Sequence, residues 1–449
     1  MIPKIIIDDF SVGILEDKTI QARNGFSYCA GMDIFSEPGI LKASQVLTAE
    51  TQADSPNNIT DAPTRIIKYG DYWYVLGGTG RIYNNSANWI LVHTDTNSGV
   101  GQSMIVFNGN LHWMGNTTMG KFDGTTWTDS FKTGFTSSSY HPMIIFENSL
   151  RIGNGRYVAT WDGSAAPELT DLTLPMGYTV RSLEIFGNRI IIGATKEKES
   201  TLFSWDGASS LPEQLWEIRE PYLSVIKNWN NLLWIFGGEG NIHVFNGAIL
   251  TKLPKKIPFY PDFTLSTFVR PGAITESQGN LIFGFGLSSF NYGGIYMIEP
   301  KSGYPLTIPY LLSVGQTGTE PFSIAYIGAG KFYVGWKSGS NYGIDLVNTS
   351  TKATSPYWES QIYEISITHN PVLIKGFEII AKPMATGTSI TVQYKTDDAA
   401  SWTSWGTINP TNQSKVYISG IGLAKTIQIR LEFTTSANNS PEIKTIKIY

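Results

Sequence analysis

The sequence predicts an all-β fold, a seven-bladed β-propeller followed by a C-terminal, jelly-roll-like β-sandwich. Three observations predict it. One supersecondary pattern recurs seven times between residues 65 and 346. After residue 355 strand-length segments continue without this repeat, and no segment of the chain has strong helical periodicity. Aromatic residues make up 13% of the 449 residues and glycine occurs 45 times, which is typical of short strands joined by tight turns.

Each repeat contains a short apolar run, a polar turn of two or three residues and a second apolar run that ends near a glycine. Successive second runs begin 38 to 51 residues apart. A propeller blade holds four strands in about 40 to 50 residues, so this spacing indicates one blade per repeat. The second runs open at Trp73, Leu111, Leu150, Ile190, Leu233, Leu281 and Phe332.

Three ranges follow from this pattern: a leader over residues 1–63, the propeller over 64–355 and the sandwich over 356–449. We expect a leader strand to pair with the last blade, because an open ring would leave an unpaired sheet edge. The best helical candidate is the short segment 211–217. The sandwich strands are predicted at 362–367, 373–380, 389–394, 414–418, 426–433 and 443–449.

Charge and cysteine content narrow the function classes. Lys and Arg number 33 against 37 Asp and Glu, a net charge of -4, and no dense basic block occurs, so we expect no direct nucleic-acid binding. The single cysteine, Cys29, excludes an internal disulfide and suits assembly in a reducing cytoplasm. The N-terminus lacks a signal-peptide apolar region and no apolar stretch is long enough to span a membrane.

A recurring aromatic-Asp/Asn-Gly motif has two interpretations. Carboxylates at equivalent blade positions could form a repeated ion or sugar site. Alternatively, Asp-Gly and Asn-Gly are the residue pairs favoured in type I′ hairpin turns, which need positive φ at both central residues. We favour the turn. The motif occurs at 122–124, 161–163, 205–207 and 245–247.

No catalytic, metal or cofactor residue is predicted, and we expect the protein not to be an enzyme. The glycine-rich segments 77–80 and 237–240 open no helix and therefore lack the phosphate-binding mechanism. No histidine pair has metal-ligand spacing. A glycoside-active propeller of the sialidase type stays as an alternative, but it needs an arginine cluster, and the ten arginines are scattered along the chain.

Trp402 and Trp405 are candidate glycan-binding residues. The tryptophans at repeat-equivalent positions, such as Trp73 and Trp113, are better explained by packing between blades. Trp402 and Trp405 lie outside the repeats, in the C-terminal range, where an indole ring could stack on a sugar. They support a second hypothesis, a carbohydrate-binding adhesin or lectin for host-surface recognition.

Short motifs at both ends of the chain suggest a family. The segments 8–13 (DDFSVG), 31–34 (GMDI), 38–41 (PGIL) and 440–444 (SPEIK) resemble the opening and closing segments of propeller-bearing structural proteins of tailed bacteriophages. The resemblance implies a non-enzymatic tail or neck component, nozzle-like, whose propeller is a scaffold or docking disc. It also implies other virion proteins as partners, a symmetric homo-oligomer, and location in the virion after assembly in the host cytoplasm.

Overall fold

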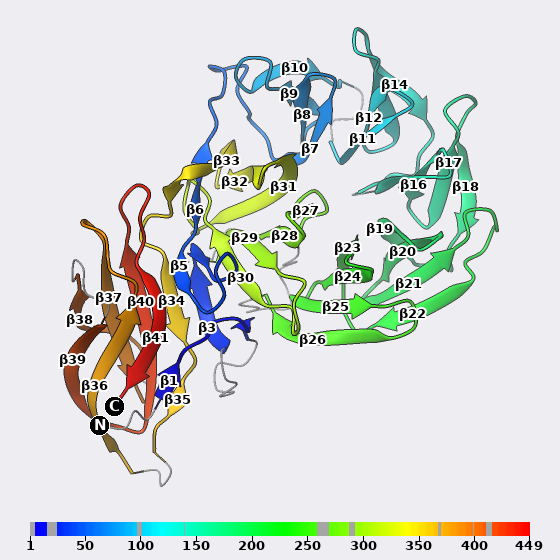
Figure 1. The fold of residues 1–449 in the computed structure, drawn as a ribbon. Helices are drawn as coiled ribbons and strands as arrows, with labels where there is room; N and C mark the ends of the chain where they lie inside the picture. The colour runs from blue at the N-terminus through cyan, green and yellow to red at the C-terminus, as the bar shows by residue number, and fades with distance from the viewer. Residues whose placement is uncertain are drawn as a thin grey trace.

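The computed structural model describes residues 5–15, 25–96, 101–138, 140–257, 269–286, 292–366, 370–397, 399–409 and 415–449. Within these ranges the regular elements are 41 β-strands, and none is a helix. Figure 1 shows small twisted sheets arranged in a ring, with a second group of longer strands beside it. The all-β prediction is confirmed, and the small sheets are of the kind that form β-propellers.

Six separate sheets have four strands each, and a seventh set, β27–β30, is part of a larger sheet. Neighbouring strands within each set are antiparallel, and the first strand of each set lies innermost. The sets are β7 (Pro63–Tyr69), β8 (Tyr72–Gly77), β9 (Arg81–Asn84) and β10 (Ile90–Thr94); β11 (Ser103–Phe107), β12 (Asn110–Met114), β13 (Thr118–Phe122) and β14 (Trp127–Thr133); β15 (Met143–Phe146), β16 (Ser149–Asn154), β17 (Tyr157–Trp161) and β18 (Glu168–Thr173); β19 (Thr179–Phe186), β20 (Arg189–Lys196), β21 (Glu199–Trp205) and β22 (Gln214–Ile218); β23 (Leu223–Trp229), β24 (Leu232–Gly237), β25 (Asn241–Phe245) and β26 (Leu250–Lys256); β27 (Ile274–Ser277), β28 (Asn280–Phe285), β29 (Gly294–Ile298) and β30 (Leu306–Tyr310); and β31 (Thr319–Gly328), β32 (Lys331–Ser338), β33 (Asn341–Lys352) and β6 (Gln45–Ala49).

The repeated sequence pattern forms the inner hairpin of each set. Ile66 lies opposite Val75 in the first hairpin, and Ile324 lies opposite Val334 in the last. Six of the seven residues that open the second runs are fully buried, and Trp73 is half-buried. The apolar repeat therefore encodes the pair of strands nearest the centre of the ring.

Two consecutive residues with positive φ, which a type I′ turn needs, occur at five of the seven inner hairpins and not at the aromatic-Asp/Asn-Gly motif. In that motif only the glycine has positive φ, as at Gly124 with 100°. The Asp123 carboxylate accepts hydrogen bonds from the N–H groups of Thr125 and Thr126, at 2.9 and 2.8 Å, and these bonds lower the pKa of Asp123 to about 2. The motif is a turn, as predicted, but the predicted type was wrong. Consecutive residues with positive φ occur instead at Asn108-Gly109, Glu147-Asn148, Asn230-Asn231, Gln278-Gly279 and Ala329-Gly330.

Contacts between the last and first sheets close the ring. The Ser323 hydroxyl on β31 donates a hydrogen bond of 2.6 Å to the Pro63 carbonyl oxygen on β7. The Tyr333 ring on β32 makes edge contacts with the rings of Trp73 and Trp89. Hydrogen bonds and ring contacts therefore join the last sheet to the first.

The N-terminal segment contributes the outer strand of the last sheet. β6 pairs antiparallel with β33, and Leu47 lies opposite Val347 in their register. Leu47 is 1% exposed and belongs to an apolar cluster with Phe332 and Trp336. Strands from residues 45–49 and 319–352 therefore share one sheet, and the beginning of the chain is held to the last repeat.

The remaining strands mix the two ends of the chain in two further sheets. One has the order β39-β36-β41-β5-β4, with β1 paired to β41; in the other, β30 of the ring is followed by β2-β3-β34-β40-β37-β38, with β35 paired to β40. Their bounds are β1 (Ile5–Ile7), β2 (Gly13–Ile14), β3 (Gly25–Ala30), β4 (Met32–Asp33), β5 (Leu41–Ala43), β34 (Tyr357–Ser360), β35 (Tyr363–Glu364), β36 (Val372–Ala381), β37 (Ser389–Thr396), β38 (Thr403–Ile408), β39 (Lys415–Ala424), β40 (Thr426–Thr434) and β41 (Glu442–Ile448).

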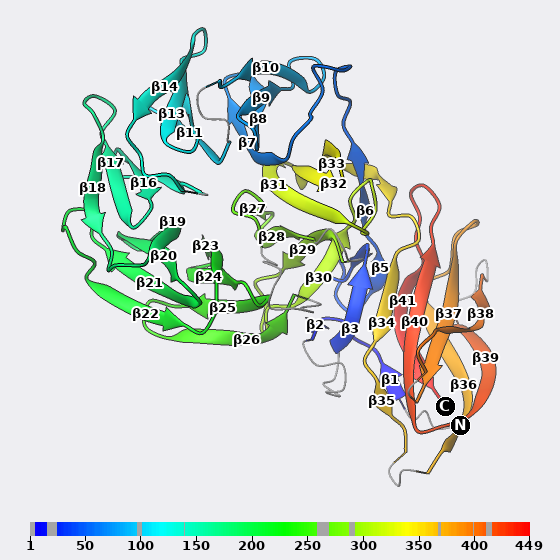
Figure 2. The same ribbon diagram turned by 180° about the vertical axis from the view of Figure 1, so that it is seen from behind.

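Each of these two sheets combines strands from more than one of the three ranges expected from the sequence. Ile5 lies opposite Ile448, and the blue N-terminal strands β3 and β5 lie between the ring and the C-terminal strands in Figures 1 and 2. Within residues 356–449, the strands β34 and β38 were not predicted. The short helical candidate at 211–217 was wrong, because its second half belongs to β22.

A large apolar cluster unites the two ends. Trp358 is fully buried, and its ring lies 5.7 Å from that of Phe10 and 6.1 Å from that of Phe26. Cys29, opposite Trp358 on the neighbouring strand, is also fully buried, and burial raises the pKa of its thiol to about 11. The thiol is therefore protonated and shielded, and its role in the described structure is packing.

His112 on β12 predicts a pH effect on stability. Burial, with Lys121 acting in the same direction, lowers the pKa of His112 to about 4. The usual histidine value is about 6.5, so between these values the unfolded chain binds a proton that the folded chain does not. The stabilising contribution is complete above pH about 6.5 and is lost as the pH falls toward 4.

Between pH 7 and pH 4, the wild type should lose about 3 kcal/mol more unfolding free energy than the His112→Leu variant. Urea unfolding of both proteins at the two pH values measures this difference. Equal losses in the two proteins would show that His112 titrates normally in the folded state.

Candidate functional site

The residues that line the centre of the ring form the leading candidate site. All seven sheets contribute a residue at or beside the start of the innermost strand, and together they line a cavity of about 320 Å³, the axial cavity. Figure 2 shows β7, β11, β19, β23, β27 and β31 around the middle of the ring. The residues used below are Gln102, Tyr140, Arg181, Tyr222, Arg270 and Phe322.

Two arginines of the axial cavity stack on aromatic rings of the neighbouring sheet. The Arg181 guanidinium carbon lies 5.0 Å from the centre of the Tyr222 ring, and that of Arg270 lies 4.6 Å from the centre of the Phe322 ring. Arg270 also donates a hydrogen bond of 3.0 Å from Nη2 to Glu320. The attraction between a guanidinium and the face of an aromatic ring helps to hold both cations in place.

A second cavity of about 280 Å³ adjoins the first, and the two share Tyr140 and Pro271 in their walls. Arg65 lines this second cavity, together with Lys227 and Glu184, which form an ion pair of 3.3 Å. Burial raises the pKa of Tyr140 and the positive charge of Arg65 acts against that rise. Three of the ten scattered arginines thus come together around the centre of the ring, an arrangement that the sequence did not reveal.

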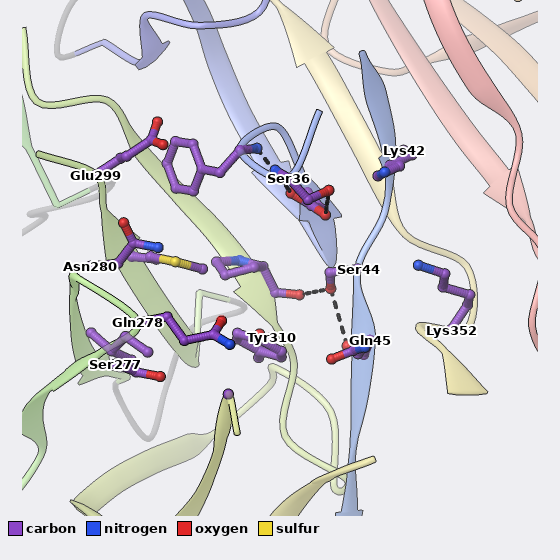
Figure 3. Close-up of a pocket in the computed structure, with 16 residues that line it drawn as sticks. Ser36, Lys42, Ser44, Gln45, Ser277, Gln278, Asn280, Glu299, Tyr310 and Lys352 are labelled. Carbon is purple, nitrogen blue, oxygen red and sulfur yellow. Dashed lines mark hydrogen bonds between the residues drawn. The ribbon is translucent and has the colours of Figure 1, made fainter. Parts of the chain in front are cut away.

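A third cavity, the junction pocket, lies where the N-terminal segment meets the last two sheets of the ring. It encloses about 350 Å³. Figure 3 shows Asn280, Gln278 and Glu299 on one side and the segment that carries Ser44 and Gln45 on the other. Amides, a carboxylate and hydroxyls therefore share one pocket, which offers hydrogen-bond donors and acceptors to a polar ligand.

Two lysines at the edge of the junction pocket are engaged with the protein. The Lys352 ammonium donates a hydrogen bond of 3.2 Å to the Ala43 carbonyl oxygen, and burial lowers its pKa. Lys42 lies 3.7 Å from a carboxylate oxygen of Glu37. Both side chains lie on the far side of the N-terminal strand from Asn280 in Figure 3. They thus help to hold this strand in place.

The glycine-rich segment 77–80 surrounds a carboxylate of the protein itself. Asp61, which is buried, accepts hydrogen bonds from the Thr79 N–H at 2.8 Å and the Tyr83 hydroxyl at 3.0 Å. A Cβ atom on Gly77 would lie 2.2 Å from an Asp61 oxygen, so this position admits only glycine without a shift.

The segment 237–240 repeats this arrangement four sheets further on. The buried Glu220 carboxylate accepts hydrogen bonds from Asn241 Nδ2 at 2.7 Å and from the Glu239 N–H at 3.1 Å, and His243 Nε2 lies 2.9 Å away. A Cβ atom on Gly237 would lie 2.2 Å from this carboxylate. The two glycine-rich segments therefore leave room for buried carboxylates of the protein and donate hydrogen bonds to them. This explains their glycine content without a role in nucleotide binding.

Trp402 and Trp405, the candidate glycan-binding residues, occupy different environments. The Trp405 ring contacts the rings of Phe377 and Tyr394. Its Nε1 donates a hydrogen bond of 2.7 Å to the Ser419 carbonyl oxygen. The half-buried Trp402 instead has the Lys395 ammonium 4.8 Å from its ring centre. The structure does not bring the two indoles together in one stacking platform.

No group of three or more His, Cys, Asp or Glu side chains that could hold a metal ion occurs among the residues that the structure describes. His93 pairs with Asp129, and the two ring nitrogens of His141 lie 2.6 and 2.9 Å from backbone carbonyl oxygens. His369 lies outside the described residues. A search of the described part of the chain also finds no helix that could cross a membrane.

Comparisons with known proteins give a likeness of fold alone. No family model and no curated protein matches the sequence. The extracellular domain assigned to a hybrid two-component system of B. thetaiotaomicron matches with a TM-score of 0.50 and 12% identity over 84% of this chain and 47% of that one. This chain thus spans about half the length of that neighbour. The WD40 β-propeller domain of Doa1 has a TM-score of 0.49 and 12% identity, over 68% of this chain and 97% of that domain.

Proposed function

We propose that the protein is a non-enzymatic structural component of a tailed-phage virion, in the tail or neck, which binds other virion proteins through its rims and its C-terminal region. In this proposal the seven sets of four strands are the blades of a closed propeller. The sheets that contain β36–β41 form a sandwich beside it, which the N-terminal strands complete.

One observation carries the proposal: the N-terminal segment is shared between the ring and the C-terminal sheets. β6 extends the last set of the ring, β5 pairs with β41, and β3 pairs with β34. A chain tied in this way transmits force between its parts without a flexible linker, as a scaffold in a particle must. The short motifs at both chain ends, which resemble tailed-phage structural proteins, supply the virion context.

The buried polar groups support a structural role. Asp61 and Glu220 accept hydrogen bonds from their own sheets, and Asp345 accepts hydrogen bonds from Ser313 and Trp336. In a catalytic site, carboxylates and histidines need access to a substrate. Here these three buried carboxylates hold loops and strands together.

Mass spectrometry of gradient-purified particles tests this proposal. The chain is expected at a stoichiometry that matches the rotational symmetry of a tail or neck, and it should stay with the particles after a high-salt wash. Particles that lack the chain, or that release it completely in salt while remaining intact, would contradict the proposal.

A carbohydrate-binding adhesin is the second candidate function, and the junction pocket favours it more than the tryptophans do. The amides of Asn280 and Gln278 and the carboxylate of Glu299 offer the directional hydrogen bonds that a polyhydroxylated ligand needs. Glycan-array binding by the wild type, its loss in the Asn280→Ala variant and its retention in Trp402→Ala would support binding in the junction pocket. Glycan binding that is lost only in Trp402→Ala would instead place the glycan-binding site on the C-terminal sheets.

A further inference from the structure

Positive charge is concentrated at the centre of a chain whose net charge is -4. Among the described residues that line the axial cavity and the second cavity beside it, four are basic and Glu184 alone is acidic. The basic residues are Arg65, Arg181, Lys227 and Arg270. Glu184 and Lys227 line only the second cavity, where they pair with each other, and the described charged residues that line the axial cavity itself are Arg181 and Arg270. Low-dielectric walls focus such a field, and an anion is the ligand that it attracts.

The two guanidinium groups are arranged to bind an anionic headgroup. Each stacks on a ring of the adjacent sheet, Arg181 on Tyr222 and Arg270 on Phe322, so each is positioned by two sheets. A guanidinium carries five N–H donors in one plane and matches the geometry of carboxylate and phosphate oxygens. Glu320 accepts a hydrogen bond from Arg270 Nη2 and offsets part of its charge, but it is not among the described residues that line the cavity.

The other walls of the axial cavity suit an apolar body. Tyr140, Tyr222 and Phe322 bring three aromatic rings to a volume of about 320 Å³, and Gln102 adds an amide. Cavities of this size are at the lower end of those that enclose small molecules, and aromatic walls with a few polar groups are usual in such sites.

We propose that the axial cavity is a binding site for a small organic anion. Arg181 and Arg270 bind its carboxylate or phosphate headgroup, and the rings of Tyr140, Tyr222 and Phe322 contact its apolar body. The inference does not depend on the proposed structural role, because a scaffold protein and an adhesin could each carry such a site.

Four related probes test the charge requirement: benzoate, phenyl phosphate, benzyl alcohol and benzylamine. Saturation-transfer NMR and titration calorimetry on the full-length protein should detect saturable binding of benzoate or phenyl phosphate. The preferred anion then distinguishes a carboxylate from a phosphate ligand. Benzyl alcohol and the cationic benzylamine should bind at least about tenfold more weakly, because a hydrogen bond to a charged group is worth about 1.5 to 3 kcal/mol.

Matched variants locate the site. Arg181→Gln should weaken binding of the preferred anion at least about tenfold. Arg156→Gln should leave it unchanged, because Arg156 stacks on Tyr157 at 4.9 Å in the same way but does not line the cavity. Tyr222→Leu, which removes the supporting ring but no charge, should also weaken it. Thermal unfolding of each variant confirms that it is folded.

Equal affinity for benzyl alcohol and the anions would overturn the proposal. Unchanged binding in a folded Arg181→Gln variant would also overturn it, as would the absence of saturable binding of either anion at millimolar concentration.

Discussion

Replacing Leu47 with aspartate is expected to destabilise the protein by about 4 kcal/mol or more, because it places an unpaired charge in an apolar cluster. Leu47 is the buried residue of β6, the strand that the N-terminal segment adds to the last sheet of the ring. The change leaves the inner hairpins of all seven sets intact. Any large loss of stability therefore reports the contribution of this one outer strand.

Thr48→Asp is the matched control, because Thr48 is the next residue on β6 and its side chain is exposed. This change should alter the unfolding free energy by less than about 0.5 kcal/mol. Urea unfolding followed by tryptophan fluorescence measures both variants. Two variants of equal stability would mean that β6 does not pack against the ring in solution.

The Trp358→Ala variant is expected to lose about 3 to 5 kcal/mol of unfolding free energy. Its ring is fully buried against Phe10 and Phe26, and β34 lies between the N-terminal strand β3 and the C-terminal strand β40. Removing the indole creates a cavity where segments from both ends of the chain meet. Calorimetry or urea unfolding measures the loss.

Trp402→Ala provides the comparison within the same region. Its ring is half-buried and contacts the Lys395 ammonium, so we expect a loss of about 1 kcal/mol or less. Since this variant stays folded, it is also the cleaner test of glycan binding at the tryptophans. If Trp358→Ala were as stable as Trp402→Ala, the assignment of Trp358 to the centre of the shared core would be wrong.

The inner hairpins could be predicted from the sequence because their signal is local. Apolar runs separated by turns such as Asn108-Gly109 specify two adjacent strands, and the partner of each strand is only a few residues away. The outer strands carry weaker patterns. β22, for example, has an exposed Leu215, and its segment gave the mistaken helical candidate.

The sharing of sheets between the two chain ends could not be predicted, because it depends on pairs far apart in sequence. Cys29 and Trp358 lie opposite each other on neighbouring strands, yet neither sequence segment indicates which strand it pairs with. The short β34 also lacks the length that marks a strand in a sequence. An unpaired edge indicated that the ring needs closure, but it did not indicate that β1, β3, β4 and β5 would join the C-terminal strands.

The candidate site was invisible to sequence reasoning for the same reason. Arg65, Arg181 and Arg270 are separated by about a hundred residues each and share no motif. Only the closure of the ring brings them to a common axis. By contrast, the glycine-rich segments were visible but their partners were not, since Asp61 and Glu220 precede them by about 16 residues.

Hydrogen exchange of the backbone amides in β6 tests most directly whether the N-terminal segment is an integral part of the ring. Mass spectrometry of peptides that cover Gln45–Ala49 should show protection close to that of the inner strands β31 and β7, because the three strands belong to one closed unit. Exchange of β6 at the rate of an unprotected peptide, with the inner strands still protected, would contradict this account.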